Sequence, residues 1–87
     1  MTEKIVEISN PLGINSRPAA LLVQTAGKFT SSVWLIKGTK RVNAKSIMGL
    51  MSLAVSKDNM VIIGAEGEDE HLAVRELVEL LTSQFKE

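Results

Sequence analysis

The sequence predicts an α+β fold in which helices cover one face of an antiparallel sheet, and two observations lead to this class. Short β-branched runs alternate with segments whose apolar residues recur at helical spacing. The order of these elements along the chain is strand, helix, strand, strand, helix, strand, helix. With 87 residues, the chain has room for one domain over 1–87 with one small core.

The first two elements are a strand and an amphipathic helix. Residues 3–8 are strand-like, and Asn10-Pro11-Leu12-Gly13 then breaks the strand. A helix is predicted over residues 17–29, with Asn15 or Ser16 as its cap. Its core face is formed by apolar residues at helical spacing, namely Ala19, Leu22, Val23, Ala26 and Phe29.

The middle of the chain predicts a hairpin, a short helix and a central strand. Residues 32–37 and 40–43 can pair across a Gly38-Thr39 turn. A brief helix then runs from Ser46 to about Leu53. The apolar, β-branched run 60–65 suits a strand inside a sheet.

The final element is an amphipathic helix. Charged residues lie opposite its apolar stripe. A carboxylate near its start, from Asp69 or Glu70, is stabilised by the positive end of the helix dipole. The apolar stripe consists of Ala73, Val74, Leu77, Val78, Leu81 and Phe85.

The two faces of the predicted sheet differ in what they can contact, because side chains alternate along a strand. Those expected to meet the helices are Val6, Ile8, Val33, Leu35, Val61 and Ile63. Those then directed to the open face are Ile5, Trp34, Ile36 and Ile62. Four large apolar side chains on an open face suit self-association. We therefore expect a homodimer that covers this face or exchanges an edge strand between chains.

The composition excludes several classes of function. Ten basic residues balance ten acidic ones, so the chain has no long-range positive field for nucleic acid or for an anionic membrane surface. Cysteine is absent, which excludes disulfides, thiol catalysis and thiolate metal sites. No apolar run approaches the roughly 18 residues of a membrane span, and the first residues lack the pattern of a signal peptide. A cytoplasmic protein is expected.

The sequence contains no recognisable catalytic or metal-binding pattern. The single histidine, His71, has no partner at metal-ligand spacing and is interpreted as a solvated surface side chain beside Asp69 and Glu70. No serine or threonine has a visible general base. The segment 64–67 lacks the glycine spacing and the lysine of a phosphate-binding loop. We therefore expect no enzymatic activity, no cofactor and no metal.

The most informative segment is Asn43-Ala44-Lys45-Ser46-Ile47-Met48-Gly49-Leu50-Met51. Ser46, which follows Lys45, stands at the start of the short helix. A helix N-terminus favours an anion there, but serine is also a common uncharged N-cap, and both interpretations are open. Leu50 and Leu53 can turn inward. The other apolar residues of this helix either form an adaptable contact surface or fill gaps in the core, and they are Ile47, Met48 and Met51.

Two segments together resemble the HPr family, the phosphocarrier proteins of the bacterial sugar phosphotransferase system. They are Leu12-Gly13-Ile14-Asn15-Ser16-Arg17-Pro18-Ala19-Ala20 and Val42-Asn43-Ala44-Lys45-Ser46-Ile47-Met48-Gly49-Leu50-Met51-Ser52-Leu53. The resemblance covers essentially the whole chain. It implies an open-faced βαββαβα sandwich, with a four-stranded antiparallel sheet and three helices on one face.

One position departs from the family pattern. Family members carry a phosphoryl-accepting histidine where this chain has Asn15. The amide nitrogen of asparagine is delocalised into its carbonyl and lacks the available lone pair of an imidazole, so phosphorelay at this site should be absent. Loss of this histidine with retention of the serine segment is similar to the HPr-like paralogues of catabolite repression in Gram-positive bacilli, although those typically have glutamine here.

The resemblance implies a regulatory role. HPr kinase/phosphorylase would phosphorylate Ser46, and the phosphorylated protein would bind the catabolite control transcription factor as a corepressor. The residues implied at that interface are Arg17, Lys45, Ile47, Met48 and Met51. A phosphoserine adds roughly 1.5 to 2 negative charges and three strong acceptors, so we expect a surface switch with little backbone change.

Two alternatives stand beside this prediction. The protein could be a divergent phosphocarrier of the phosphotransferase system that uses another residue, such as His71. It could also be a constitutive protein-interaction module that is independent of phosphate.

Overall fold

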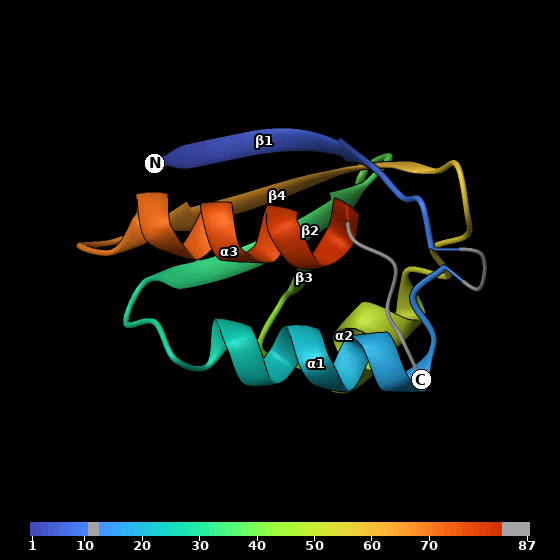
Figure 1. Ribbon diagram of the computed structural model, residues 1–87, viewed down its shortest axis with the longest axis horizontal. Coiled ribbons are helices and arrows are strands. Elements are labelled where there is room, and N and C mark those ends of the chain that lie inside the picture. The colour runs from blue at the N-terminus through green and yellow to red at the C-terminus, as the bar shows by residue number, and fades with distance from the viewer. Residues whose placement is uncertain (11–12, 83–87) are drawn as a thin grey trace.

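The computed structural model describes residues 1–10 and 13–82, and it confirms the predicted class and order of elements (Figure 1). The elements are β1 (Thr2–Glu7), α1 (Ser16–Ala26), β2 (Ser32–Lys37), β3 (Lys40–Asn43), α2 (Ile47–Ser52), β4 (Met60–Glu66) and α3 (Glu70–Thr82). The sheet has the order β1-β4-β2-β3, and every pair of neighbouring strands is antiparallel. The first strand therefore pairs with the last one.

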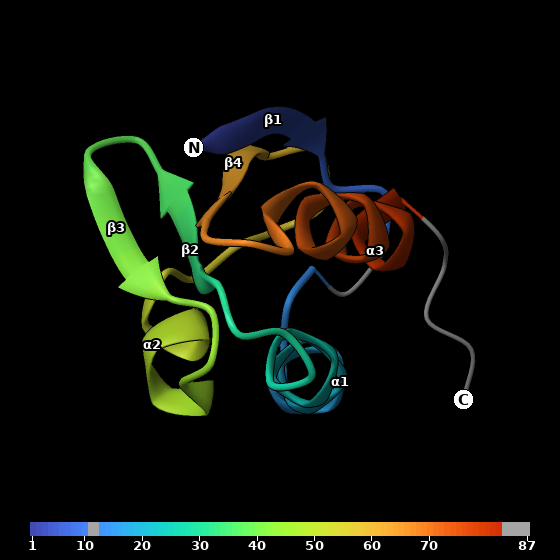
Figure 2. The ribbon, with the colours of Figure 1, turned by 90° about the vertical axis from the view of Figure 1, so that its left-hand side faces the viewer.

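All three helices lie on one side of the sheet, and the core fills the space between the two layers (Figure 2). The strand residues expected to face the helices are all buried, each at most 4% exposed: Val6, Ile8, Val33, Leu35, Val61 and Ile63. The period of two therefore predicted the core face of the sheet correctly. The apolar stripe of α3 is also buried at Ala73, Val74, Leu77 and Leu81, while Phe85 lies outside the described residues.

The open face of the sheet corrects one prediction. Ile5 is exposed and pairs with Ile62, which in turn pairs with Ile36, so three isoleucines form a row across the sheet. Trp34, in contrast, is only 4% exposed. The alternation assigns a side chain to one side of a sheet, but it does not reveal which neighbours cover that side chain.

The cover on Trp34 comes from the three other strands of the sheet. The Arg41 guanidinium lies 4.1 Å from the centroid of the indole ring, and the indole Nε1 donates to Glu3 Oε2 at 3.3 Å. The ring lies against Gly64, its partner in the ladder, where an added Cβ would be 2.3 Å from Nε1. The absence of a side chain at Gly64 therefore makes room for the indole on the open face.

Helix α1 ends earlier than the predicted boundary of residue 29. It ends at Ala26, and the N–H groups of Lys28 and Phe29 then bond to carbonyls three residues back, at 3.1 and 3.2 Å. This tighter turn carries the Phe29 side chain into the core from outside the helix. The predicted helix was too long because Phe29 continues the apolar spacing of the helix although it lies in the turn that follows.

None of the helices in the described part of the chain is long and apolar enough to span a membrane.

Candidate functional site

Ser46 is the N-cap residue of α2, as one of the two interpretations of the sequence predicted. Its backbone is extended, with φ −120° and ψ 117°, and its Oγ accepts a hydrogen bond from the Gly49 N–H at 3.1 Å. The Ser46 carbonyl accepts the first bond of the helix, from Leu50 N at 3.0 Å. A Cβ at Gly49 would lie 3.3 Å from Ser46 Oγ, so glycine allows this close approach. The hydroxyl is half-buried and held in a defined place.

The apolar residues that flank Ser46 on α2 are exposed and do not fill the core. Met48 is 83% exposed, and Ile47 and Met51 are 43% and 45% exposed. Leu50 and Leu53 turn inward and are buried, as expected. The question left open by the sequence is therefore decided in favour of an apolar surface around the serine, formed by flexible side chains that can adapt to a partner.

Helix α1 lies beside α2 and contributes to the same side of the molecule (Figures 1 and 2). Leu21 on α1 is 38% exposed. Leu21 was not among the interface residues predicted from the sequence. Its position outside the buried stripe of α1 was the signal that could have indicated it. Leu21 is a further apolar side chain on the helix that neighbours the Ser46 segment.

Asn15 and Arg17 lie at the start of α1 and are both exposed. Asn15 occupies the N-cap position, and its carbonyl accepts from Ala19 N at 2.9 Å. Its side chain makes no capping hydrogen bond, so the predicted cap is present in the backbone alone. The loop before α1 is tied to the segment after α2, because Ile14 N donates to the Val55 carbonyl at 3.1 Å.

The Asn43 side chain and Lys45 organise the approach to Ser46. Asn43 Oδ1 accepts from Lys45 N at 2.8 Å, and the Asn43 carbonyl accepts from Ser46 N at 3.1 Å. The Lys45 side chain is half-buried, and its ammonium donates to the Phe29 carbonyl at 2.9 Å. This contact joins the segment before α2 to the turn after α1.

Two lysines of the β2–β3 hairpin satisfy carbonyls at the other end of α2. Lys37 Nζ donates to Leu53 O at 3.3 Å and to Ala54 O at 2.9 Å, and Lys40 Nζ donates to Ser52 O at 3.2 Å. Cations suit a helix C-terminus because the unpaired carbonyls there carry partial negative charge. These contacts were not predicted from the sequence, since no periodicity links a hairpin lysine to a helix end.

The acidic residues at the start of α3 have structural partners. Asp69 accepts from the Ser31 hydroxyl and from the N–H groups of Thr30 and Ser31, and these bonds hold its pKa at about 2, below its ordinary value. The Thr2 hydroxyl and the N-terminal ammonium lower the pKa of Glu70 to about 2. Both carboxylates therefore connect α3 to distant parts of the chain.

His71 is exposed, and its Nδ1 lies 3.0 Å from the Thr2 hydroxyl oxygen. This position agrees with the expected surface side chain. Within residues 1–10 and 13–82, no three side chains of the metal-ligating types come together.

The described residues thus define a small α+β protein that holds a serine beside an exposed apolar helix surface. Residues 2–83 match the family described as the PTS HPr component phosphorylation site. The chain belongs to this HPr family.

Relatives within the family include an HPr-like protein and an HPr. The HPr-like protein Crh of Bacillus subtilis (strain 168) is 54% identical over 77 residues, which cover 88% of this chain and 91% of that protein. The crystal structure of HPr-C-His from Thermoanaerobacter tengcongensis has a TM-score of 0.90 and 56% identity, over 93% of this chain and 91% of that one. These relatives are phosphocarrier or regulatory proteins and not enzymes.

A crystal structure of Bacillus subtilis Crh, described as a catabolite repression protein and a domain-swapped dimer, matches with a TM-score of 0.79 and 48% identity and covers all of both chains. The relatives support an HPr-like protein connected with catabolite repression.

Proposed function

We propose that this protein is a regulatory phosphoprotein of carbon catabolite repression. HPr kinase/phosphorylase phosphorylates Ser46, and the phosphorylated form acts as a corepressor of the catabolite control transcription factor. The observation that carries the proposal is the arrangement at α2, where a fixed serine hydroxyl stands next to Ile47, Met48 and Met51, all of them exposed. A partner can read the added charge and the apolar surface together.

The physical chemistry of this arrangement suits a switch. A phosphate on Ser46 adds roughly 1.5 to 2 negative charges and three strong acceptors, which a basic group of the partner can pair with. The apolar side chains of α2 give the partner area to bury, which contributes affinity. Arg17 on α1 and Lys45 before the serine belong to the same proposed interface. The cap on α2 can persist in the phosphorylated protein, so the backbone need not change.

Asn15 excludes the phosphohistidine role from this proposal. Its side chain is exposed at the start of α1, and the resemblance implies that this is the position of the family's histidine. A carboxamide does not accept a phosphoryl group as an imidazole does. Regulation through Ser46 is then the function left to this surface.

The test separates loss of phosphate from loss of the helix cap. Wild-type protein incubated with HPr kinase and ATP should acquire one acid-stable phosphate and should bind the transcription factor only in that form. Ser46→Asn retains a good N-cap but accepts no phosphate, so it should fold as the wild type and remain unlabelled and inactive. Ser46→Ala removes both the cap and the acceptor. If Ser46→Asn still binds the factor as phosphorylated wild type does, the proposal is wrong.

A second incubation tests the phosphocarrier alternative. Enzyme I and phosphoenolpyruvate should leave the protein unlabelled. Acid-labile phosphate that disappears in His71→Ala would support the carrier reading instead, and partner binding that is the same for wild type and Ser46→Asn without kinase would support a constitutive interaction module.

We also propose that the protein forms a homodimer, as Crh does in its crystal structure. Among the described strands, β1 forms a ladder with β4 alone, so the same ladder can form with β4 of a second copy. The row of Ile5, Ile62 and Ile36 offers a second surface for self-association. Sedimentation at high concentration should show a dimer. Ile5→Lys should dissociate a dimer built on the open face and should leave a strand-exchanged dimer intact, whereas a strictly monomeric wild type would exclude both.

A further inference from the structure

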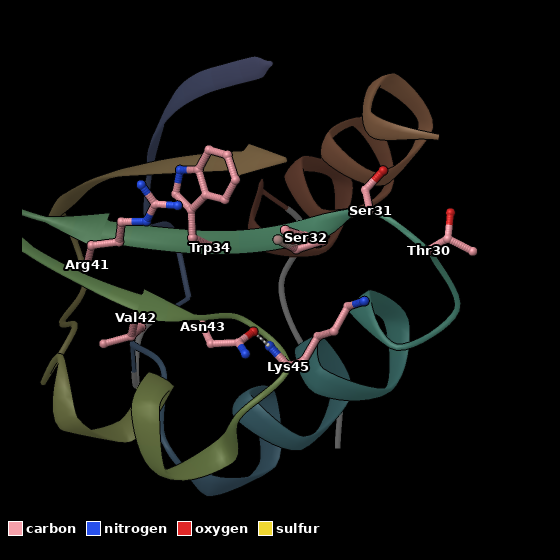
Figure 3. A pocket seen from close by; sticks show the side chains of 9 residues that line it. Thr30, Ser31, Ser32, Trp34, Arg41, Val42, Asn43 and Lys45 are labelled. Carbon is pink, nitrogen blue, oxygen red and sulfur yellow. Dashed lines mark hydrogen bonds between the residues drawn. The ribbon is translucent and has the colours of Figure 1, made fainter. Parts of the chain in front are cut away.

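A groove on the molecule is separate from the apolar surface of α2. It has a volume of about 460 Å³ and opens between the start of β2 and the end of β3 (Figure 3). Its principal polar side chains come from three segments, and they are Thr30, Ser32, Arg41, Asn43 and Lys45. Trp34 and Arg41 lie at one end of the groove in Figure 3, and Thr30 lies at the other.

The groove holds two cations, Arg41 and Lys45. Among the described residues, no carboxylate forms an ion pair with Arg41 or Lys45. The Arg41 guanidinium rests on the face of Trp34, a contact that leaves its N–H edge available. The Lys45 ammonium has one acceptor, the Phe29 carbonyl, and keeps two further N–H groups. Because the chain as a whole is neutral, this is a local excess of positive charge.

The nearby acids are occupied or lie outside the groove. Glu3 accepts the Trp34 Nε1–H, and Asp69 accepts the N–H groups of Thr30 and Ser31. Glu66 pairs with Ser32 in the ladder, but it does not line the groove. Among the described residues, therefore, no carboxylate lines the groove, although Glu3, Glu66 and Asp69 keep their negative charges beside it.

The uncommitted polar groups are donors. Asn43 uses its Oδ1 to accept from Lys45 N, so its Nδ2 has two N–H groups left. Ser32 is exposed, and its hydroxyl can donate. Together with Arg41 and Lys45, these groups present donors and no free carboxylate. Such a set matches a ligand rich in acceptor oxygens.

The geometry points to a binding site for a small phosphate-bearing anion in this groove, with Arg41 at one end and Lys45 at the other. Along an extended chain at about 3.3 Å per residue, four residues separate their Cα atoms by at most about 13 Å. A single phosphate can engage either cation, and an anion with two phosphoryl groups offers each cation a phosphoryl group of its own. The site requires no phosphate on Ser46, although Lys45 also belongs to the proposed interface around that serine.

The indole of Trp34 supplies the signal for a test, because it is the only tryptophan and carries Arg41 on its face. We would titrate the protein with inorganic phosphate and with pyrophosphate at constant ionic strength, following tryptophan fluorescence and backbone amide NMR shifts. Pyrophosphate should bind more tightly than phosphate. The amide shifts should be confined to residues 30–34 and 41–45.

Two variants decide between a site and general attraction. Arg41→Gln should weaken pyrophosphate binding about tenfold or more, as expected for loss of a charge-assisted contact. Lys57→Gln removes one exposed positive charge at a residue that does not line the groove, and it should bind as the wild type does. Equal weakening in both variants, shifts spread over all surface lysines, or a signal that does not saturate would overturn the proposal.

The outcome is distinguishable from that of the Ser46 proposal. Ser46→Asn should bind pyrophosphate unchanged, and Arg41→Gln should still be phosphorylated by the kinase. Failure of pyrophosphate binding in a protein that is phosphorylated normally refutes only the groove.

Discussion

The substitution Gly64→Ala should destabilise the protein, because the added Cβ would collide with the indole of Trp34. A Cβ there would lie 2.3, 2.5 and 2.8 Å from three atoms of the indole, whereas ordinary contacts begin at 3.4 Å. The indole must therefore move by about 1 Å or leave the sheet. A buried tryptophan covers about 200 Å², and exposing a quarter to a half of it at about 25 cal/mol per Å² loses about 1 to 2.5 kcal/mol. This agrees with the 1–3 kcal/mol typical of overpacking.

The measurement is urea unfolding followed by circular dichroism, together with the emission of the only tryptophan. We expect a lower midpoint and a red-shifted emission, because the displaced indole gains contact with water. Gly38→Ala is the matched control. Gly38 has φ +61° with nothing near its missing Cβ, so its replacement strains the backbone but should leave the emission of Trp34 unchanged.

A double-mutant cycle identifies the cause of the lost stability. With Trp34→Val in place, the space above residue 64 is open, and Gly64→Ala should become nearly neutral. The coupling between the two positions should therefore be about 1–3 kcal/mol. If the two changes are additive, or if Gly64→Ala leaves both the midpoint and the emission unchanged, the seating of Trp34 on Gly64 is refuted.

Three further predictions concern acid stability and the ends of α2. The pKa values of Asp69 and Glu70 are lowered to about 2 in the folded protein, so their stabilisation is fully present above their ordinary values near 4 and is lost as the pH falls through about 2. Asp69→Asn should lower the unfolding midpoint at pH 7 and flatten the decline between pH 4 and pH 2; an unchanged acid profile would contradict this. Ala54 has φ 52°, a left-handed conformation that favours glycine, and Ala54→Gly should raise the free energy of unfolding by about 0.5–1 kcal/mol, whereas a loss would contradict the assigned backbone. Lys37→Met keeps much of the side-chain length but removes the donor to two carbonyls after α2, so amide exchange in α2 should accelerate while β4 stays protected, and uniform acceleration would show a global effect instead.

The elements and the core face could be predicted from the sequence because both follow from periodicity. Apolar residues at a spacing of two placed Val61 and Ile63 toward the helices, and both are buried. The cap at Ser46 could also be predicted, since it depends on a local bond from Gly49. Both features are determined by residues that lie within a few positions of each other in the sequence.

The remainder depends on contacts between distant residues. The cover over Trp34 depends on the strand register that places Trp34 opposite Gly64. The two lysines that donate to carbonyls at the end of α2 belong to the β2–β3 hairpin. The exposure of Met48 was undecided from sequence because a methionine on a short helix suits a core and a surface equally. Only the packing of α2 against the sheet and α1 answers that question.

The pairing of β1 with β4 affects how the chain emerges during synthesis. Glu7 pairs with Met60, so more than 50 residues must be made before the first strand has a partner. At roughly 5–20 residues per second, that interval is about 3–10 s. Throughout it, Val6 and Ile8 have no sheet to enter, and a neighbouring chain on the same messenger can offer its completed β4 first. In the strand-exchanged dimer proposed above, ribosome spacing and the local concentration of nascent chains would therefore influence which sheet β1 joins.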